Sequence, residues 1–352
     1  MKIIHLLFSF TAGGAEILAV DLINEMCLKN EVTLIIVNDI FNEALIQTIN
    51  KKVKIYYLNR KAGSKNPIPL IKLNLLLFRL KPDILHCHNF NMGDAIKLKN
   101  LNLVYTIHDV GIPINYLKKY KFLAAISDAV KMDIEARSSF KPTTIVNGIN
   151  NKLFQKRTNY TLTSSEPFKI IQVSRLIHEK KGQDILINTI QIVKEKYQLN
   201  NIQLDIVGAG HSKEYLENLI STLNIEDNVH LLGEKNRHWV YQNLCNYHLL
   251  VQPSRFEGFG LTVVEGLAAG LPVLASKIDG PLEILSQTQS GFLFKNENPV
   301  DCAEKIYAIY QLYIKNDIEA IIKGSENVAE SKYSVVQSAK KYLDVYKILI
   351  NK

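Results

Sequence analysis

The chain has 352 residues, of which 47% are hydrophobic and 22% charged, and it carries a formal net charge of +8 at pH 7. This length favours two domains over a single hydrophobic core, and the composition excludes a disordered or fibrous protein. No apolar run approaches the roughly 20 residues that span a bilayer, and the four cysteines lack metal-ligand spacing, which predicts free thiols in a reducing cytoplasm.

The first half of the chain alternates short apolar runs with helical patterns. Buried strands are predicted at 2–8, 32–37, 54–58, 84–87, 103–107, 122–126 and 144–146, and amphipathic helices at 16–29 and 69–80. This alternation is typical of a parallel, doubly wound sheet. The polar segment 150–167 interrupts the pattern and is predicted to be an interdomain linker.

A second series of alternating elements follows this segment. Its strands are predicted at 168–173, 203–207, 229–232, 248–252, 272–275 and 291–294, and its helices at 183–197, 213–223, 260–269 and 299–314. We therefore predict two Rossmann-like domains, 1–160 and 161–334, with a last helix of about 335–352 packing back on the first. Ligands bind beyond the carboxyl ends of doubly wound strands, so two facing domains would hold the site in the cleft between them.

The strongest functional signal is the run SRFEGFGLTVVEGLAAGLPVLAS at 254–276, which joins a strand through a glycine-rich turn to a helix. Gly258 and Gly260 let a ligand approach the backbone, and the helix N-terminus offers unpaired N–H groups to a phosphate. Glu257 can accept hydrogen bonds from sugar hydroxyls, and Glu265 can hold a ribose diol. The alternative is a plain strand–turn–helix connection with a solvated glutamate, which leaves these paired features unexplained.

A basic block, VSRLIHEKKGQDILI at 173–187, precedes the acidic block by 76 residues, counted from Lys181 to Glu257. Arg175 follows a predicted strand, and Lys181 stands directly before Gly182 at the start of a helix. Such a pair can clamp a diphosphate, the Arg in bidentate fashion and the Lys as a point charge. Lys180 is an alternative to Lys181, and a solvated basic loop is the alternative to both.

Two further groups of residues follow strands of the first half. Gly13 and Gly14 precede a helix, where backbone amides can approach an anion, but the G-x-G-x-x-G dinucleotide pattern is absent, which disfavours NAD. Three histidines, His86, His88 and His108, lie at the ends of predicted strands and could point into a ligand site. No third ligand at useful spacing joins His86 and His88, so no metal site is predicted.

The acidic block resembles the E-x7-E signature of the retaining glycosyltransferases of family 4, which have the GT-B fold. Glu257, the seven residues after it and Glu265 carry the match. The resemblance implies that Glu257 contacts the donor sugar and that Glu265 binds the ribose. It also implies that Phe259, Gly260 and Leu261 line the sugar and the diphosphate.

The basic block and a histidine resemble the same family. Arg175 and Lys181 are similar to its diphosphate-binding Arg and Lys. His108, followed by Asp109, resembles the histidine of its THD motif, which lies beside the donor sugar, so the resemblance implies a catalytic role for His108. Of the remaining polar residues at strand ends, His86 is expected to be packed, and His88 and Asp109 are candidate acceptor contacts.

Four glycines complete the resemblance. The pair Gly13 and Gly14 is similar to the family's GGAE loop, which closes over the donor phosphates. Gly208 lies in a VGAG sequence that resembles the family's VGxG turn, and Gly233 ends a strand that resembles the one flanking the base. The resemblance implies that all four help to bind the donor.

The resemblance implies a metal-independent, retaining, hexosyltransferase-type enzyme (EC 2.4) that moves a sugar from a nucleoside diphosphate sugar to a hydroxyl of a glycan or lipid-linked acceptor. UDP is the common nucleotide of the family, and bacterial surface polysaccharide (lipopolysaccharide or capsule) synthesis is the expected setting. No cofactor is expected, because Arg175 and Lys181 can neutralise the diphosphate. The alternatives are a GT-B sugar-nucleotide epimerase and a catalytically silent partner subunit that binds sugar nucleotides.

The charge is unevenly distributed along the chain. Residues 1–160 carry 22 Lys and Arg against 12 Asp and Glu, a net +10, whereas residues 161–352 carry 20 against 22, a net −2. With basic clusters at 51–52, 60–65 and 118–121 and aromatic neighbours such as Tyr116 and Tyr120, this predicts docking to an anionic membrane surface, on the cytoplasmic face of an inner membrane. The alternative is a lysine-rich surface that serves solubility; no motif for nucleic acid binding is present.

Overall fold

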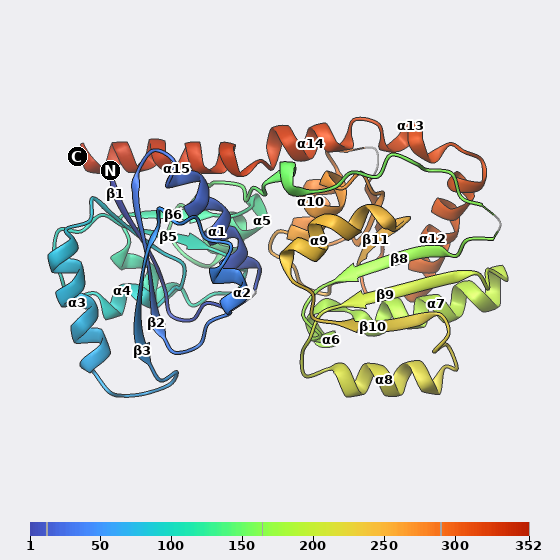
Figure 1. The fold of residues 1–352 in the computed structure, drawn as a ribbon, viewed down its shortest axis with the longest axis horizontal. Coiled ribbons are helices and arrows are strands. Elements are labelled where there is room, and N and C mark those ends of the chain that lie inside the picture. Colours follow the sequence, from blue (N-terminus) through green and yellow to red (C-terminus); the bar gives the residue numbers. More distant parts are fainter. Residues whose placement is uncertain (12, 164, 289–290, 352) are drawn as a thin grey trace. The chain divides into compact units, whose positions relative to one another are not determined.

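The computed structural model describes residues 1–11, 13–163, 165–288 and 291–351 (Figure 1). Ala12 of the glycine block, Ser164 of the predicted linker and Lys352 of the predicted last helix lie outside the described residues. The chain divides into two compact units, the first formed by Met1–Asn150 and Tyr333–Lys352 and the second by Asn151–Lys332.

The first unit contains a seven-stranded parallel sheet in the order β3-β2-β1-β4-β5-β6-β7. Its strands are β1 (Lys2–Leu7), β2 (Glu31–Asn38), β3 (Lys54–Arg60), β4 (Ile84–Cys87), β5 (Leu103–Ile107), β6 (Phe122–Ala125) and β7 (Thr143–Thr144). The inner strands are continuous apolar runs because both faces of the sheet are covered. The strand order reverses between β1 and β4, which makes the carboxyl ends of these strands the position where such sheets bind ligands.

Helices of the first unit include one from the C-terminal end of the chain. They are α1 (Gly14–Met26), α2 (Glu43–Ile46), α3 (Ile68–Leu80), α4 (Met92–Ala95), α5 (Asp128–Arg137) and α15 (Val335–Ile350). In α15 the residues Val335, Ala339, Tyr342 and Tyr346 are buried, and their spacing puts them on one helical face. This face packs against the core of the unit beside α1.

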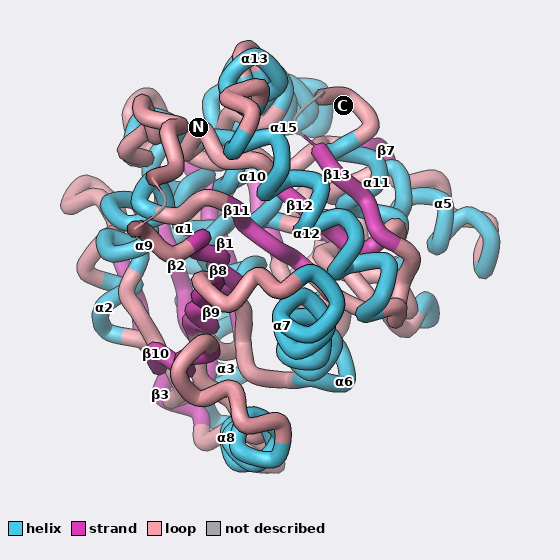
Figure 2. The backbone as a smooth tube through the Cα atoms, turned by 90° about the vertical axis from the view of Figure 1, so that its right-hand side faces the viewer, coloured by secondary structure: helices cyan, strands magenta, loops and turns pink. Residues whose placement is uncertain are grey.

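The second unit contains a six-stranded parallel sheet in the order β10-β9-β8-β11-β12-β13. Its strands are β8 (Phe168–Val173), β9 (Ile202–Val207), β10 (Val229–Gly233), β11 (Leu249–Gln252), β12 (Val273–Ser276) and β13 (Gly291–Phe294). In Figure 2 this unit faces the viewer, with α7 and α10 on opposite sides of the strands. The order reverses between β8 and β11, so the loops after these two strands lie at the switch point.

Helices of the second unit surround this sheet. They are α6 (His178–Lys181), α7 (Gln183–Tyr197), α8 (Lys213–Thr222), α9 (Arg237–Asn243), α10 (Leu261–Ala268), α11 (Asp279–Leu285), α12 (Pro299–Ile314), α13 (Ile318–Ile322) and α14 (Ser325–Lys332). Apolar residues of α7 and α12 pack together in the core. Within the described ranges, no helix of either unit combines the length and the apolar character needed to cross a membrane.

The predicted parallel, doubly wound architecture is confirmed in both units. The boundary between the units lies after residue 150 rather than after 160, because the predicted linker begins with a packed segment. In that segment the Gln155 N–H donates to the Tyr241 carbonyl, and the Arg157 N–H donates to the Ala269 carbonyl, each at 2.9 Å. Its polar composition reflects hydrogen bonds to the backbone of the second unit.

Candidate functional site

Two glycines bring the loops at the switch point of the second unit into contact. Gly182 has φ +65°, and a Cβ atom built on it would lie 2.0 Å from the carbonyl oxygen of Pro253. Gly208 has φ +147°, and its Cβ would lie 1.8 Å from the carbonyl oxygen of Ser174. Only glycine allows both the positive φ and the close approach. As a result, the loops after β8, β9 and β11 pack against one another.

Substituting Gly182 with alanine should therefore destabilise the protein and displace the adjacent Lys181. The expected loss is about 2–4 kcal/mol, because a backbone clash is added to the roughly 1 kcal/mol that a positive φ costs alanine. Gly63→Ala is the matched control, since Gly63 has φ +76° with nothing within 4 Å of its Cβ position. Urea unfolding of the two variants measures the difference, and equal losses would contradict the packing argument.

Lys181 and Glu257 form an ion pair at this loop contact. The Lys181 Nζ lies 2.6 Å from the Glu257 Oε2, and the two side chains are 15% and 16% exposed. The same oxygen accepts a hydrogen bond from Gln252 Nε2 at 2.8 Å and one from Ser254 Oγ at 3.4 Å. Among the described residues no partner contacts the second carboxylate oxygen of Glu257, so a sugar hydroxyl can bind there.

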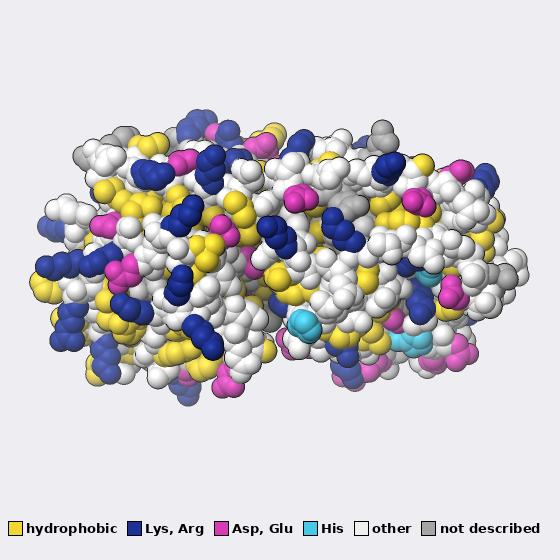
Figure 3. Space-filling model, turned by 45° about the horizontal axis from the view of Figure 1, so that its top comes forward, with side chains coloured by type: hydrophobic (Ala, Val, Ile, Leu, Met, Phe, Trp, Pro, Cys, Tyr) yellow, Lys and Arg dark blue, Asp and Glu magenta, His cyan; other side chains and the backbone are white. Residues whose placement is uncertain are grey.

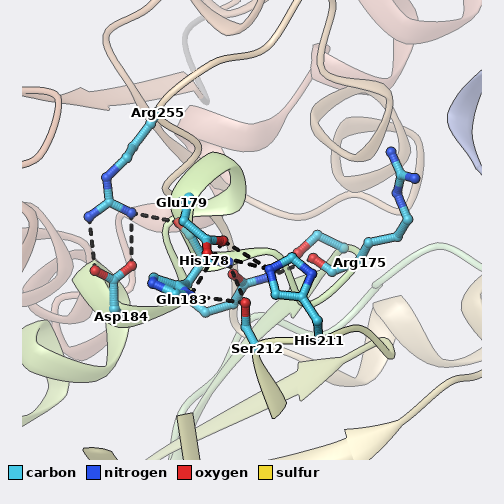
Figure 4. Close-up of polar contacts among 9 residues, drawn as sticks. Arg175, His178, Glu179, Gln183, Asp184, His211, Ser212 and Arg255 are labelled. Atoms are coloured by element: carbon cyan, nitrogen blue, oxygen red, sulfur yellow. Dashed lines mark hydrogen bonds and ion pairs between the residues drawn. The ribbon is translucent and has the colours of Figure 1, made fainter. Parts of the chain in front are cut away.

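Arg175 presents a cation on the loop after β8 that has no charged partner among the described residues. The residue lies two positions after the end of β8 and is exposed, and within the described part of the chain its guanidinium makes no hydrogen bond or ion pair. In Figure 4 the Arg175 side chain extends away from the polar cluster of His178, Glu179 and Ser212. An exposed guanidinium on this loop can bind phosphate oxygens in bidentate fashion.

A second arginine, Arg255, fastens the loop after β11 to the loop after β8. Its guanidinium donates to both carboxylate oxygens of Asp184 at 2.9 and 2.8 Å, and to the backbone carbonyl of His178 at 2.6 Å (Figure 4). The hydrogen bonds to Asp184, the largest cause, raise the pKa of Arg255 above its ordinary value. Arg255 therefore holds in place the backbone that carries Lys181 and Glu257.

Helix α10 carries the second acidic residue of the predicted site. Glu265 is 1% exposed, and its carboxylate forms an ion pair with the Arg237 guanidinium of α9. The Nε of Arg237 also donates to the Tyr241 hydroxyl at 3.1 Å, and the guanidinium carbon lies 4.7 Å from the Tyr241 ring centroid. A carboxylate so well buried needs a cation, and Arg237 supplies it.

The glycine-rich turn before α10 positions the remaining predicted donor residues. Gly260 has φ +99° and caps the helix, which leaves the first N–H groups of α10, beginning with Leu261, without a capping side chain. Phe259 is only 3% exposed, and its backbone packs against Gly280, where a Cβ atom would lie 2.5 Å from the Phe259 carbonyl oxygen. Gly233 ends β10 with φ +70° and has open space at its Cβ position, whereas Gly208 serves loop packing.

In the first unit, Gly13 and Gly14 stand at the start of α1. Gly13 caps the helix with an ordinary extended conformation and no side-chain hydrogen bond. A Cβ on Gly14 would have nothing within 4 Å, so contacts within the described chain do not require glycine there. The Glu16 carboxylate, however, lies at this helix terminus, because a Cβ on Gly13 would be 2.5 Å from the Glu16 Oε2, and an anion that binds here must compete with it.

Three histidines form a hydrogen-bonded chain at the switch point of the first sheet. His5 Nδ1 lies 3.0 Å from His88 Nε2, and His88 Nδ1 lies 3.1 Å from His108 Nε2. In a neutral imidazole one nitrogen donates and the other accepts, so the tautomers of the three rings are linked. Both nitrogens of His88 are thus engaged and the side chain is 4% exposed. The predicted acceptor contact of His88 stays a prediction.

A fourth histidine joins this cluster through the C-terminal helix. His86 Nδ1 lies 2.6 Å from the Tyr346 hydroxyl, and His86 Nε2 lies 2.6 Å from the Thr106 hydroxyl. The Thr106 hydroxyl also lies 2.7 Å from that of Tyr342. Nitrogens of His5, His86 and His88 lie within 4.8 Å of one another, so His5 is the third neighbour that sequence spacing did not show. The rings of His86 and His88 stack at 24°, so their in-plane lone pairs do not converge on one ion.

Burial keeps these imidazoles neutral. It lowers the pKa of His5 to about 3 and that of His108 to about 4, and it holds the pKa of His86 and His88 well below the usual range. Asp109, beside His108, opposes this effect, and its carboxylate accepts a hydrogen bond from the Val110 N–H at 3.0 Å. Each ring therefore stays uncharged at neutral pH.

This cluster should make the protein less stable in mild acid. The unfolded chain takes up protons below a pKa of about 6.5, whereas the folded state does not until about pH 4, so the free energy of unfolding falls as the pH falls through this window. Each histidine contributes a slope of up to about 1.4 kcal/mol per pH unit. Urea unfolding at several pH values in this window measures the slope of the free energy of unfolding against pH. For His5→Asn this slope should be smaller than in the wild type by up to about 1.4 kcal/mol per pH unit. An unchanged slope would contradict this assignment.

Sequence reasoning missed three residues that build these sites. Arg255 lies inside the acidic block, but its partner Asp184 is far away in sequence. Arg237 lies in a helix that carried no functional signal. His5 was treated as part of a buried strand, and only the pairing of β1 with β4 places it opposite His86.

Comparison with known protein families covers both units. Residues 12–152 match the family model described as Glycosyltransferase Family 4, and residues 156–327 match the model described as Glycosyl transferases group 1. An uncharacterized glycosyltransferase of Methanocaldococcus jannaschii is 27% identical over 301 residues, which cover 76% of this chain and 76% of the relative.

Two further relatives have more specific names. The poly(ribitol-phosphate) alpha-N-acetylglucosaminyltransferase of Staphylococcus aureus is 32% identical over 178 residues, 49% of this chain and 34% of that enzyme. The crystal structure of Anabaena HepE in complex with UDP and glucose is similar with a TM-score of 0.81, at 21% identity and 99% coverage of each chain. The structural likeness concerns the fold.

Proposed function

This chain belongs to glycosyltransferase family 4 and has the GT-B fold, and from this premise we propose that it transfers a sugar from a UDP-sugar to a hydroxyl of a glycan or lipid-linked acceptor, with retention at the anomeric carbon. The observation that carries the proposal is the ion pair of Lys181 and Glu257, formed where the loops after β8 and β11 meet at the switch point of the second sheet, with the exposed Arg175 on the first of these loops. The relatives support the donor class, since one is named for N-acetylglucosamine transfer and one was solved with UDP.

In this proposal the two cations stabilise the leaving diphosphate. Arg175 is free to bind phosphate oxygens at once, whereas Lys181 must share its charge between Glu257 and the donor. The open N-terminus of α10 adds N–H groups to the same negative charge. Such preorganised donors stabilise charge that develops in the transition state. We propose that these groups replace a divalent metal, so activity should withstand a chelator.

The carboxylates have separate proposed roles. Glu257 holds the donor sugar through the oxygen that Lys181 does not occupy, and Glu265 holds the ribose once the donor displaces part of its contact with Arg237. His108 remains the proposed catalytic histidine of the first unit. With a pKa of about 4 it is neutral at pH 7, so it would act as a hydrogen-bonding group rather than as a cation.

We propose that the reaction belongs to bacterial surface polysaccharide synthesis on the cytoplasmic face of the inner membrane. The basic character of residues 1–160 supports docking to an anionic leaflet, where lipid-linked acceptors are found. Tyr120, one of the aromatic side chains expected to contribute there, is buried in the first unit. Membrane contact must therefore be made by other residues.

The donor assignment is tested by thermal unfolding in the presence of nucleotides. UDP at about 100 times its dissociation constant should stabilise the protein by roughly 2.7 kcal/mol. GDP and ADP at the same concentration serve as controls for the base. Equal shifts with all three nucleotides would show recognition of the diphosphate alone, and no shift with any of them would contradict the proposed site.

A further inference from the structure

Helix α3 presents an apolar face to solvent. Ile68, Ile71, Leu75 and Phe78 are 55%, 55%, 54% and 64% exposed, and their spacing of three, four and three residues forms one stripe along the helix. The opposite face packs on β3 and β2 through the buried residues Leu73 and Leu77. A surface helix normally turns polar residues to water, so this outer stripe needs another explanation.

The segment of sequence that contains this stripe is basic, although one of its cations, Lys54, is paired with Glu31. From 44 to 82 the chain has nine Lys and Arg and neither Asp nor Glu, the cations being Lys51, Lys52, Lys54, Arg60, Lys61, Lys65, Lys72, Arg79 and Lys81. Lys72 and Arg79 are exposed on α3 itself, and within the described chain neither forms an ion pair. Figure 3 shows Lys and Arg side chains on the first unit, at the left of the view, with hydrophobic and a few acidic side chains between them.

An apolar stripe with cations along its flank has the pattern of a helix that lies in a membrane interface. The apolar side chains enter the boundary between headgroups and acyl chains, while Lys and Arg remain at the level of anionic phosphates. A protein partner would need an acidic rim around an apolar groove, whereas a second copy of this chain would bring the same cations against one another.

We propose that the outer face of α3 is the surface by which this protein docks on an anionic lipid membrane. This inference rests on the proposed membrane association and assigns it to one helix that the charge argument from sequence did not use. The docking is peripheral and needs no spanning segment. It holds the first unit at the membrane through Ile68, Ile71, Leu75 and Phe78.

The test compares two triple variants of the full chain by co-sedimentation with vesicles. Ile71→Gln, Leu75→Gln and Phe78→Gln together polarise the stripe. The control, Leu28→Gln, Met132→Gln and Ile348→Gln, changes side chains of the same unit that are 53%, 67% and 56% exposed. All six positions are on the surface, so folding should be unaffected, which circular dichroism checks.

Vesicles of phosphatidylcholine with about one third phosphatidylglycerol should bind the wild type and the control alike. The α3 variant should bind on the order of 100-fold more weakly, because each half-exposed side chain that enters the interface is worth about fivefold in partitioning. Lys72→Gln with Arg79→Gln should weaken binding to these vesicles roughly 25-fold and leave binding to pure phosphatidylcholine unchanged.

The outcomes separate this inference from the broader proposal. If the wild type ignores anionic vesicles, both membrane association and the α3 surface are wrong. If the wild type binds and the α3 variant binds equally well, docking occurs elsewhere and only the assignment to α3 is wrong. A wild-type dimer in light scattering that the α3 variant converts to a monomer, with unchanged vesicle binding, would assign the stripe to self-association and overturn the inference.

Discussion

Replacing Arg175 with alanine is expected to lower the turnover of the enzyme by about 100- to 1000-fold, the cost of removing one well-placed donor to a developing charge. The change should affect catalysis without affecting the fold, because no ion pair within the described chain is lost when the Arg175 guanidinium is removed. The free energy of unfolding should therefore remain within about 0.5 kcal/mol of the wild type. Steady-state release of UDP measures the turnover.

Two lysine variants extend this test to the neighbouring cation. Lys181→Ala should produce a loss of similar size, since Lys181 lies against Glu257, whereas Lys180→Ala should leave turnover nearly unchanged. Lys315→Ala, at an exposed position on the same unit, controls for the loss of a surface charge. A Lys180 variant more impaired than the Lys181 variant would show that the diphosphate is held by Lys180.

Replacing Arg237 with alanine is expected to destabilise the fold by about 3–5 kcal/mol. The change leaves the Glu265 carboxylate buried without its cation, and breaking a buried pair by removing one partner has a cost of this size. The KM for the donor should rise as well, because Glu265 loses the contact that orients it. Urea unfolding measures the stability change.

The exposed pair of Lys54 and Glu31 provides the control for Arg237. These side chains are 60% and 50% exposed and lie 3.0 Å apart, so Lys54→Ala should leave the free energy of unfolding almost unchanged. Adding Glu265→Gln to the Arg237 variant should recover part of the lost stability, because the buried negative charge is removed. If Arg237→Ala and Lys54→Ala lower the free energy of unfolding equally, the buried ion pair contributes no more to stability than the exposed one, which would contradict this prediction.

Much of the fold could be predicted from sequence because the strands are apolar runs of the length that a buried parallel sheet requires. Strand β13 and helix α12 were placed with their observed bounds. The short β7, in contrast, was misplaced by about one residue and extended, because an edge pair of threonines carries little apolar signal. The boundary at 150 was missed because polar composition does not distinguish a packed segment from a free one.

The acidic and basic blocks were recognisable as candidate site residues from their sequence patterns, but their mutual contacts were not. Lys181 contacts Glu257 because β8 pairs with β11 and because Gly182 has no Cβ atom to block the close approach of the Pro253 carbonyl. Sequence spacing does not reveal strand order, and the same limit hid the pairing of His5 with His88. The exposed apolar face of α3 could not be predicted for another reason. The helix is apolar on both sides, so the periodicity of its sequence does not show which side is buried.

The central claim, transfer of a sugar from a nucleoside diphosphate sugar, is tested most directly by product analysis. The wild type and Arg175→Ala would be incubated with a panel of UDP-sugars and bacterial lipid-linked glycans, and the products identified by mass spectrometry. We expect one UDP-sugar to yield UDP and an acceptor heavier by one sugar residue, with almost no product from Arg175→Ala. An epimerised free sugar, an unchanged donor with every acceptor, or equal product from both proteins would contradict the account.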